Sequence, residues 1–113
     1  MRAGFIGAGK VGFSLGRYLA EGGVTVTGYY SRNSRSAREA AEFTGTDHYE
    51  DLDAITADSD TLFITVPDGA IAGVWDQLRD LPIKDKNICH CSGSISSTVF
   101  FDAEDKGACA YSV

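Results

Sequence analysis

A glycine-rich turn close to the amino terminus constrains the fold more than any other feature of the chain. The mostly apolar segment Arg2–Ile6 leads into Gly7-Ala8-Gly9-Lys10-Val11-Gly12, and apolar residues at helical spacing follow directly. A buried strand that passes through G-x-G-x-x-G into a helix is the arrangement that binds the pyrophosphate of a dinucleotide. Gly7 permits the tight turn, Gly9 lets a phosphate approach the helix N-terminus, and Gly12 lets the helix pack against the strand. We therefore predict pyrophosphate contacts from Gly7 to Gly12, in preference to a purely structural turn.

Strands and helices alternate along the rest of the chain. Residue patterns predict strands over residues 2–6, 24–30, 46–49, 60–66, 87–91 and 107–113. The helices between them are predicted over residues 10–21, 34–44, 51–57, 67–79 and 95–105. Such alternation produces a parallel sheet with helices on both faces. We expect an α/β fold, a doubly wound, six-stranded Rossmann sheet in the order 3-2-1-4-5-6.

The apolar pattern also predicts which helix residues face the core. In the first helix, the predicted buried stripe consists of Val11, Leu15, Tyr18 and Leu19. In the second helix, the inward-facing residues are predicted to be Ala37, Ala40, Ala41 and either Phe43 or Thr44. Ser34 is expected to be the N-cap of this second helix.

A polar segment at the end of the second strand narrows the choice of nucleotide. An NAD or FAD site has a carboxylate here for the ribose hydroxyls, but this chain has Ser31-Arg32-Asn33-Ser34-Arg35. Hydroxyl and guanidinium groups instead favour a ribose that carries a 2′-phosphate. We predict that Ser31, Arg32, Asn33 and Arg35 bind NADP, the alternative being a solvated polar turn that caps a helix.

Two further segments end strands at the edge of the sheet where ligands of such folds bind. Val66-Pro67-Asp68 ends the fourth strand, and Val66, Pro67 and Ile71 are predicted to contact adenine or ribose. Asp68 is expected to cap the next helix or to meet the cofactor.

His90-Cys91-Ser92-Gly93-Ser94 ends the fifth strand on the same edge. His90 and Ser92 are weak catalytic candidates that would face nicotinamide or substrate. A strand end that turns into a helix also needs small and capping residues for structural reasons alone, so no catalytic residue is assigned.

Composition excludes several classes of protein. The net charge of −6 and the pI near 4.7 argue against nucleic-acid and anionic-membrane partners. No apolar run approaches the ~20 residues of a membrane span, and the first strand leaves no room for a targeting peptide, so we expect a cytoplasmic protein. Three cysteines form no closed disulfide set, and with His48 and His90 they lack zinc-ligand spacing. We expect reduced, mostly buried thiols and no metal.

The motifs taken together resemble a known family. Gly4–Gly12, Tyr30–Asn33, Val66–Asp68 and His90–Gly93 are similar to segments in the N-terminal domain of Rossmann-like NADP oxidoreductases. These are relatives of pyrroline-5-carboxylate reductase, 6-phosphogluconate dehydrogenase and the deazaflavin-dependent NADP oxidoreductases. The nearest resemblance is to a branch with a His-Cys-Ser-Gly segment and a helical C-terminal domain.

The resemblance implies NADP contacts at the glycine turn, at Ser31 and Arg32, and along Val66–Asp68. It also implies that residues 1–113 are an NADP-binding domain, which in relatives is followed by a helical domain that completes the substrate pocket and often a homodimer. The function expected is hydride transfer between NADP(H) and a small polar substrate. A non-catalytic NADP-binding or sensing module, or a protein-interaction module, remains open.

Overall fold

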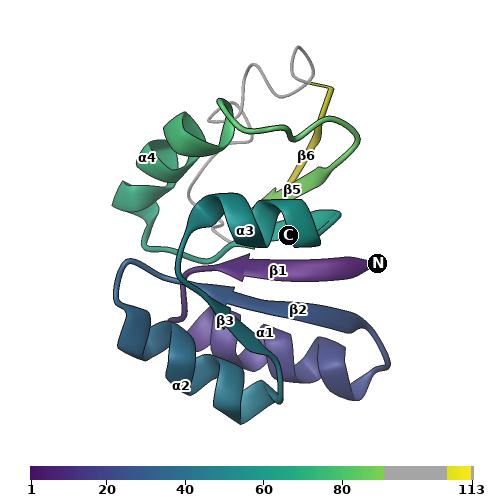
Figure 1. Ribbon diagram of the computed structural model, residues 1–113, viewed down its shortest axis with the longest axis vertical. Helices are drawn as coiled ribbons and strands as arrows, with labels where there is room; N and C mark the ends of the chain where they lie inside the picture. The colour runs from purple at the N-terminus through teal and green to yellow at the C-terminus, as the bar shows by residue number, and fades with distance from the viewer. Residues whose placement is uncertain (91–106, 113) are drawn as a thin grey trace.

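The computed structural model describes residues 1–90 and 107–112, which form a six-stranded sheet in the order β3-β2-β1-β4-β5-β6 (Figure 1). All neighbouring strands pair in parallel. The strands are β1 (Arg2–Ile6), β2 (Thr25–Tyr30), β3 (Asp47–Tyr49), β4 (Thr61–Ile64), β5 (Asn87–His90) and β6 (Cys109–Ser112). The described helices are α1 (Lys10–Glu21), α2 (Ser34–Thr44), α3 (Leu52–Asp58) and α4 (Asp68–Leu78). The predicted fold class and strand order are therefore confirmed.

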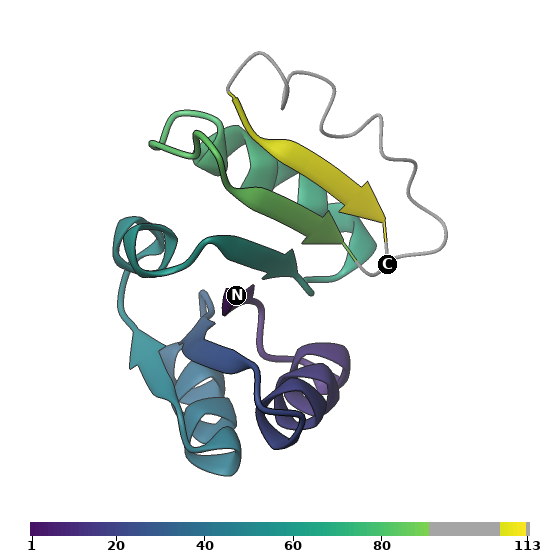
Figure 2. The ribbon, with the colours of Figure 1, turned by 90° about the vertical axis from the view of Figure 1, so that its right-hand side faces the viewer.

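Helices cover both faces of the sheet (Figure 2). Successive side chains of a strand point to opposite faces, so the strands present apolar side chains to the helices on each side. Ile6, Leu62, Ile64 and Ile88 pack with apolar side chains of α3 and α4, including the buried Trp75. Phe5, Phe63 and Cys89 belong to the core on the opposite face, where α1 and α2 pack. β1, β4 and β5 thus each contribute to two cores, which is why these strands read as nearly continuous apolar runs.

An aromatic ladder crosses the sheet under α1 and α2. Phe5 pairs in register with Tyr29 on β2 and with Phe63 on β4. Its ring stacks on both neighbours, with centroids 5.1 Å apart in each case. The Tyr29 hydroxyl donates a 2.7 Å hydrogen bond to the carbonyl of Gly12, in the first turn of α1. This bond ties the start of α1 to the sheet.

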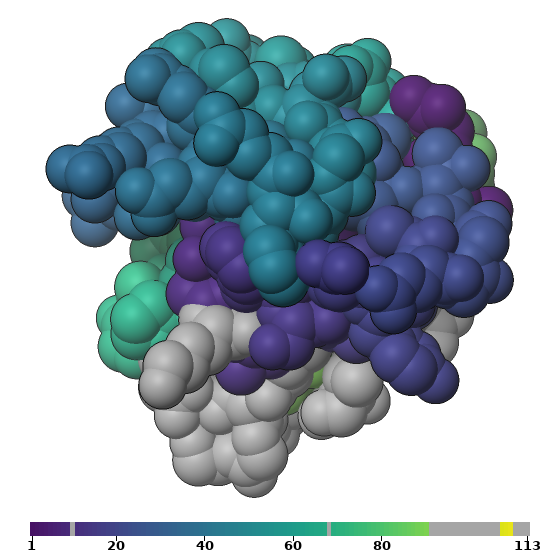
Figure 3. Space-filling view, turned by 90° about the horizontal axis from the view of Figure 1, so that it is seen from below, coloured from purple at the N-terminus to yellow at the C-terminus, as the bar shows by residue number. Residues whose placement is uncertain are grey.

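The residue bounds of α1 agree with the prediction, but its buried face does not. Val11 is 53% exposed and Tyr18 is 74% exposed, so the prediction that they are buried is wrong. Gly12 and Gly16 are buried and lie against Thr65 and Tyr29, respectively. Because glycine has no side chain, the helix approaches the sheet along its glycines, and Leu15 and Leu19 pack only partly against the core. The exposed surfaces of α1 and α2 make up much of the coloured surface seen in Figure 3.

Three helix starts refine the predicted boundaries. Asn33, not Ser34, is the N-cap of α2, and its side chain accepts a hydrogen bond from the N–H of Arg35. Asp51 caps α3 through the N–H of Ala54. Pro67 occupies the N-cap position of α4, so Asp68 is its first helical residue and not its cap.

In α2 the three predicted alanines are buried, whereas Phe43 is 44% exposed and stacks on Phe13. Of the cysteines, Cys89 is buried and Cys109 is exposed. Cys109 is therefore an exception to the expectation of mostly buried thiols. The predicted helix over residues 95–105 and Cys91 lie outside the described residues. In the described part of the chain, no helix has the length and apolar character that a membrane span requires.

Candidate functional site

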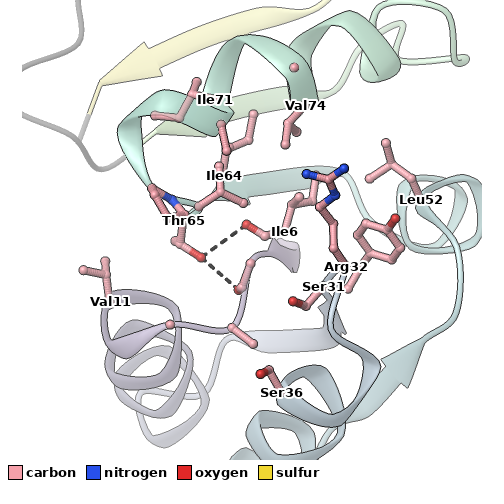
Figure 4. Close-up of a pocket in the computed structure, with 18 of the residues that line it drawn as sticks. Ile6, Val11, Ser31, Arg32, Ser36, Leu52, Ile64, Thr65, Ile71 and Val74 are labelled. Atoms are coloured by element: carbon pink, nitrogen blue, oxygen red, sulfur yellow. Dashed lines mark hydrogen bonds between the residues drawn. The ribbon is translucent and has the colours of Figure 1, made fainter.

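A cavity of about 930 Å³ opens at the carboxyl edge of the sheet, where β1, β2 and β4 end (Figure 4). Its walls come from the glycine turn, the β2–α2 segment, the end of β4, α4, and Leu52 at the start of α3. The lining residues are Ile6, Gly7, Ala8, Gly9, Val11, Tyr30, Ser31, Arg32, Ser36, Leu52, Ile64, Thr65, Val66, Pro67, Gly69, Ala70, Ile71, Gly73, Val74 and Gln77. The order of the strands brings together residues as far apart in the sequence as Ile6 and Gln77.

The glycine turn forms the floor of this cavity. Gly7 has a φ of +104°, a conformation that favours glycine, and its N–H donates to the carbonyl of Tyr30 at 2.7 Å. A Cβ at Gly7 would lie 2.9 Å from the backbone of Thr65 and Val66. Gly9 is the N-cap of α1, and a Cβ there would meet nothing within 4 Å. Packing within the described residues therefore requires glycine at Gly7, whereas Gly9 leaves open space at the helix N-terminus.

The N-terminus of α1 supplies the polar groups of the turn. The first N–H groups of a helix have no partner within the helix and carry the positive end of its dipole. In α1 the N-cap is a glycine, so no cap side chain accepts a hydrogen bond from these donors. Such an arrangement suits an anion such as a phosphate. Lys10 is the first residue of α1, and Gly12 lies beneath the turn against Thr65 and does not line the cavity.

The β2–α2 segment divides into residues that line the cavity and residues that do not. Ser31, Arg32 and Ser36 line it, with both serine hydroxyls below the Arg32 side chain in Figure 4. The side chain of Asn33 caps α2, where it accepts a hydrogen bond from the N–H of Arg35. Arg35 points elsewhere: its side chain is 85% exposed and pairs with Glu39 at 3.2 Å. The structure therefore places two of the four predicted 2′-phosphate ligands at the cavity and adds Ser36.

Among the residues whose side chains the structure describes, Arg32 is the only charged one that lines the cavity. Within the described residues it forms no ion pair, in contrast to Arg17 and Arg35, which pair with Glu21 and Glu39. No carboxylate among the described side chains lines the cavity beside it. In a chain with a net charge of −6, the described part of the cavity lining thus carries a positive charge, which favours an anionic ligand.

The opposite wall is mainly apolar. The predicted contact residues Val66, Pro67 and Ile71 all line the cavity, and Leu52 and Val74 extend the apolar surface toward Arg32. Such a surface suits the flat faces of a base or a ribose.

His90, which ends β5, is fully buried and does not line the cavity. Ser92 lies outside the described residues. Among the described residues, no group of three or more His, Cys, Asp or Glu side chains is arranged to hold a metal ion.

Sequence reasoning missed Ser36, Leu52, Thr65 and the α4 residues Gly73, Val74 and Gln77. Ser36 had a local signal, because it follows the Asn33 cap by three residues on the same helix turn. Thr65 directly precedes Val66 and Pro67, which are predicted to contact adenine or ribose. Leu52 had no local signal, since only the sheet order brings α3 beside the cavity.

Comparisons with known structures agree with this fold. A protein from Bacteroides fragilis, provisionally assigned as an NADP oxidoreductase, is 26% identical, with a TM-score of 0.75 over 88% of this chain. A reductive aminase from Aspergillus terreus in complex with NADPH is 20% identical, with a TM-score of 0.77 over 97% of this chain. The 3-hydroxyisobutyrate dehydrogenase of Mycobacterium tuberculosis is 20% identical, with a TM-score of 0.78 over 96%.

The chain spans less than two fifths of the length of each of these proteins: 38%, 39% and 38%, respectively. No curated protein sequence matches it significantly. The family model described as "NADP oxidoreductase coenzyme F420-dependent" matches residues 2–91, which include every element that lines the cavity. The chain therefore belongs to the family of coenzyme F420-dependent NADP oxidoreductases.

Proposed function

We propose that this chain binds NADP(H) in the cavity at the carboxyl edge of its sheet. The pyrophosphate lies against the glycine turn and the N-terminus of α1, and the 2′-phosphate lies against Ser31, Arg32 and Ser36. The apolar wall from Val66 to Val74 receives the adenosine. One observation carries the proposal: among the described residues that line the cavity, the only charged side chain is Arg32, which forms no ion pair and stands where an NAD site has a carboxylate.

We further propose that the chain is the nucleotide-binding domain of an oxidoreductase that acts on a small polar substrate. Bound NADPH supplies the hydride, while this chain binds and orients the nucleotide. Family membership supports this role, as does the likeness to longer dehydrogenases and reductases. In this account a helical domain following residues 1–113 completes the substrate pocket and the dimer, and the protein works in the cytoplasm.

Titration calorimetry with NADP and with NAD tests the binding proposal directly. A single charge-assisted contact to the 2′-phosphate is worth about 1.5–3 kcal/mol, so NADP should bind at least about tenfold more tightly than NAD. Equal affinity for the two nucleotides would contradict the assignment of Ser31 and Arg32.

Turnover separates the enzyme from a sensing module. A longer version of the protein that carries the helical domain should oxidise NADPH with an imine, a keto acid or another small carbonyl substrate. Tight NADP binding without turnover across such a panel would favour the sensing module.

A further inference from the structure

Thr65, the residue that follows β4, holds the backbone that enters the glycine turn. Its hydroxyl donates to the carbonyl of Gly7 at 2.9 Å and lies 3.3 Å from the carbonyl of Ile6 (Figure 4). Its own N–H donates to the carbonyl of Ile6 at 2.8 Å. Backbone and side chain of one residue therefore hold two consecutive carbonyls at the end of β1.

These contacts fix the first peptide of the turn. The N–H of Gly7 donates to the carbonyl of Tyr30, at the end of β2, and the carbonyl of Gly7 accepts from Thr65, directly after β4. Because β2 and β4 flank β1, Gly7 is held from both sides. The peptide that joins Gly7 to Ala8 is trans, so its N–H and carbonyl point in opposite directions. Holding the Gly7 carbonyl against Thr65 therefore turns the Ala8 N–H away from Thr65.

The same hydroxyl also sets the position of α1. A Cβ at Gly12 would lie 2.6 Å from the Thr65 hydroxyl oxygen and 2.9 Å from the carbonyl of Gly7. The first turn of α1 therefore packs at Gly12 against the two oxygen atoms that form the Thr65–Gly7 hydrogen bond. Thr65 contacts both the first and the last glycine of the motif, and it lines the cavity between them.

We propose that Thr65 is a positioning residue for the dinucleotide. Its hydroxyl holds the glycine turn and the N-terminus of α1 in the arrangement that presents backbone N–H groups to the pyrophosphate. The proposal rests on the NADP-binding function inferred above. It assigns the effect to the pyrophosphate region and not to the 2′-phosphate region, because Thr65 contacts the glycine turn and none of the contacts described for it involves Ser31, Arg32 or Ser36.

Thr65→Val, which keeps the shape and removes the hydroxyl, tests this role by calorimetry with two probes. NADP affinity should fall about three- to tenfold, the effect of one lost neutral hydrogen bond. Affinity for adenosine 2′-monophosphate, which has no pyrophosphate, should stay at the wild-type value. Thr65→Ser, which restores the hydroxyl, should recover most of the NADP affinity. Thr65→Ala gives the same test if the valine variant does not fold.

Thr61→Val is the matched control, because it removes a hydroxyl from the opposite end of β4. Thr61 donates to Asp60 at 2.9 Å and does not line the cavity. This variant should lose stability and keep wild-type affinity for NADP.

The outcomes separate this inference from the proposed function. Selective loss of NADP affinity with serine rescue supports the positioning role. Wild-type NADP affinity in Thr65→Val, or equal loss for both probes, refutes the role and leaves the proposed function standing. A wild-type chain that binds neither probe would refute both.

Discussion

The contact between Gly16 and Tyr29 provides a quantitative test of how α1 docks on the sheet. A methyl group added at Gly16 would overlap the Tyr29 hydroxyl oxygen and would lie 2.9 Å from the ring carbon that carries it. The ring has little freedom to withdraw, because it stacks on Phe5 and its hydroxyl is bonded to the carbonyl of Gly12. Gly16→Ala should therefore destabilise the fold although alanine is the better helix former.

The magnitudes follow from the two opposing effects. Overpacking a well-filled core costs about 1–3 kcal/mol, and replacing a helical glycine by alanine regains about 0.5–1 kcal/mol. With a rigid ring as the neighbour, we expect a net loss of about 1–2 kcal/mol in the free energy of unfolding. Tyr29→Phe removes one hydrogen bond and should cost about 1 kcal/mol. In the double variant the overlapping oxygen is absent, so the combined loss should be smaller than the sum by about 1 kcal/mol or more.

Urea unfolding followed by the fluorescence of the single, buried Trp75 gives all the values of this cycle. Gly73→Ala is the matched control, since a Cβ at Gly73 meets nothing within 4 Å. It should stabilise the chain by about 0.5–1 kcal/mol. Losses at Gly16 and Tyr29 that add to within about 0.5 kcal/mol, as independent sites do, would refute the docking contact.

Three further predictions follow from individual contacts. The pKa of Asp60 lies below its ordinary value of 3.8, chiefly because its carboxylate accepts a hydrogen bond from the N–H of Arg2. The stability that the ionised carboxylate contributes is therefore complete above pH 3.8 and is lost as pH falls through the lower pKa of the folded state. Asp60→Asn should accordingly flatten the acid limb of urea midpoints measured against pH. Burial, reinforced by the hydrogen bond to Asp58, raises the pKa of Tyr49 from 10.0 to about 12, so its contribution is complete below pH 10 and is lost as pH rises through about 12. An alkaline limb unchanged in Tyr49→Phe would contradict this. Ser36→Ala should lower NADP affinity several-fold in calorimetry and leave NAD affinity unchanged, and an equal loss for both nucleotides would place Ser36 away from the 2′-phosphate.

Much of the fold could be predicted because its signals are local. The bounds of β1 and α1 follow from apolar spacing between a strand and a glycine pair, and the structure reproduces them without change. The error at α2 is equally local. Asn33 and Ser34 are both good cap residues in adjacent positions, so propensity cannot decide between them.

The buried face of α1 and part of the cavity could not be predicted, because they depend on contacts across the sheet. Only the arrangement of β2 beside β1 shows that Tyr29 fills the space above Gly16. The role of Thr65 depends in the same way on the pairing of β4 with β1. Sequence patterns locate glycine turns well, but they do not show which side chain a glycine makes room for.

The preference for a 2′-phosphorylated nucleotide is the central claim, and Arg32→Ala tests it most directly. Calorimetry on the wild-type chain and this variant, each titrated with NADP and with NAD, gives the four affinities needed. Arg35→Ala is the matched control, because Arg35 pairs with Glu39 outside the cavity. Arg32→Ala should weaken NADP binding by about tenfold or more and leave NAD binding near wild type. Arg35→Ala should bind both nucleotides with near wild-type affinity. Equal weakening of NADP and NAD in Arg32→Ala, or no weakening of either, would contradict the account.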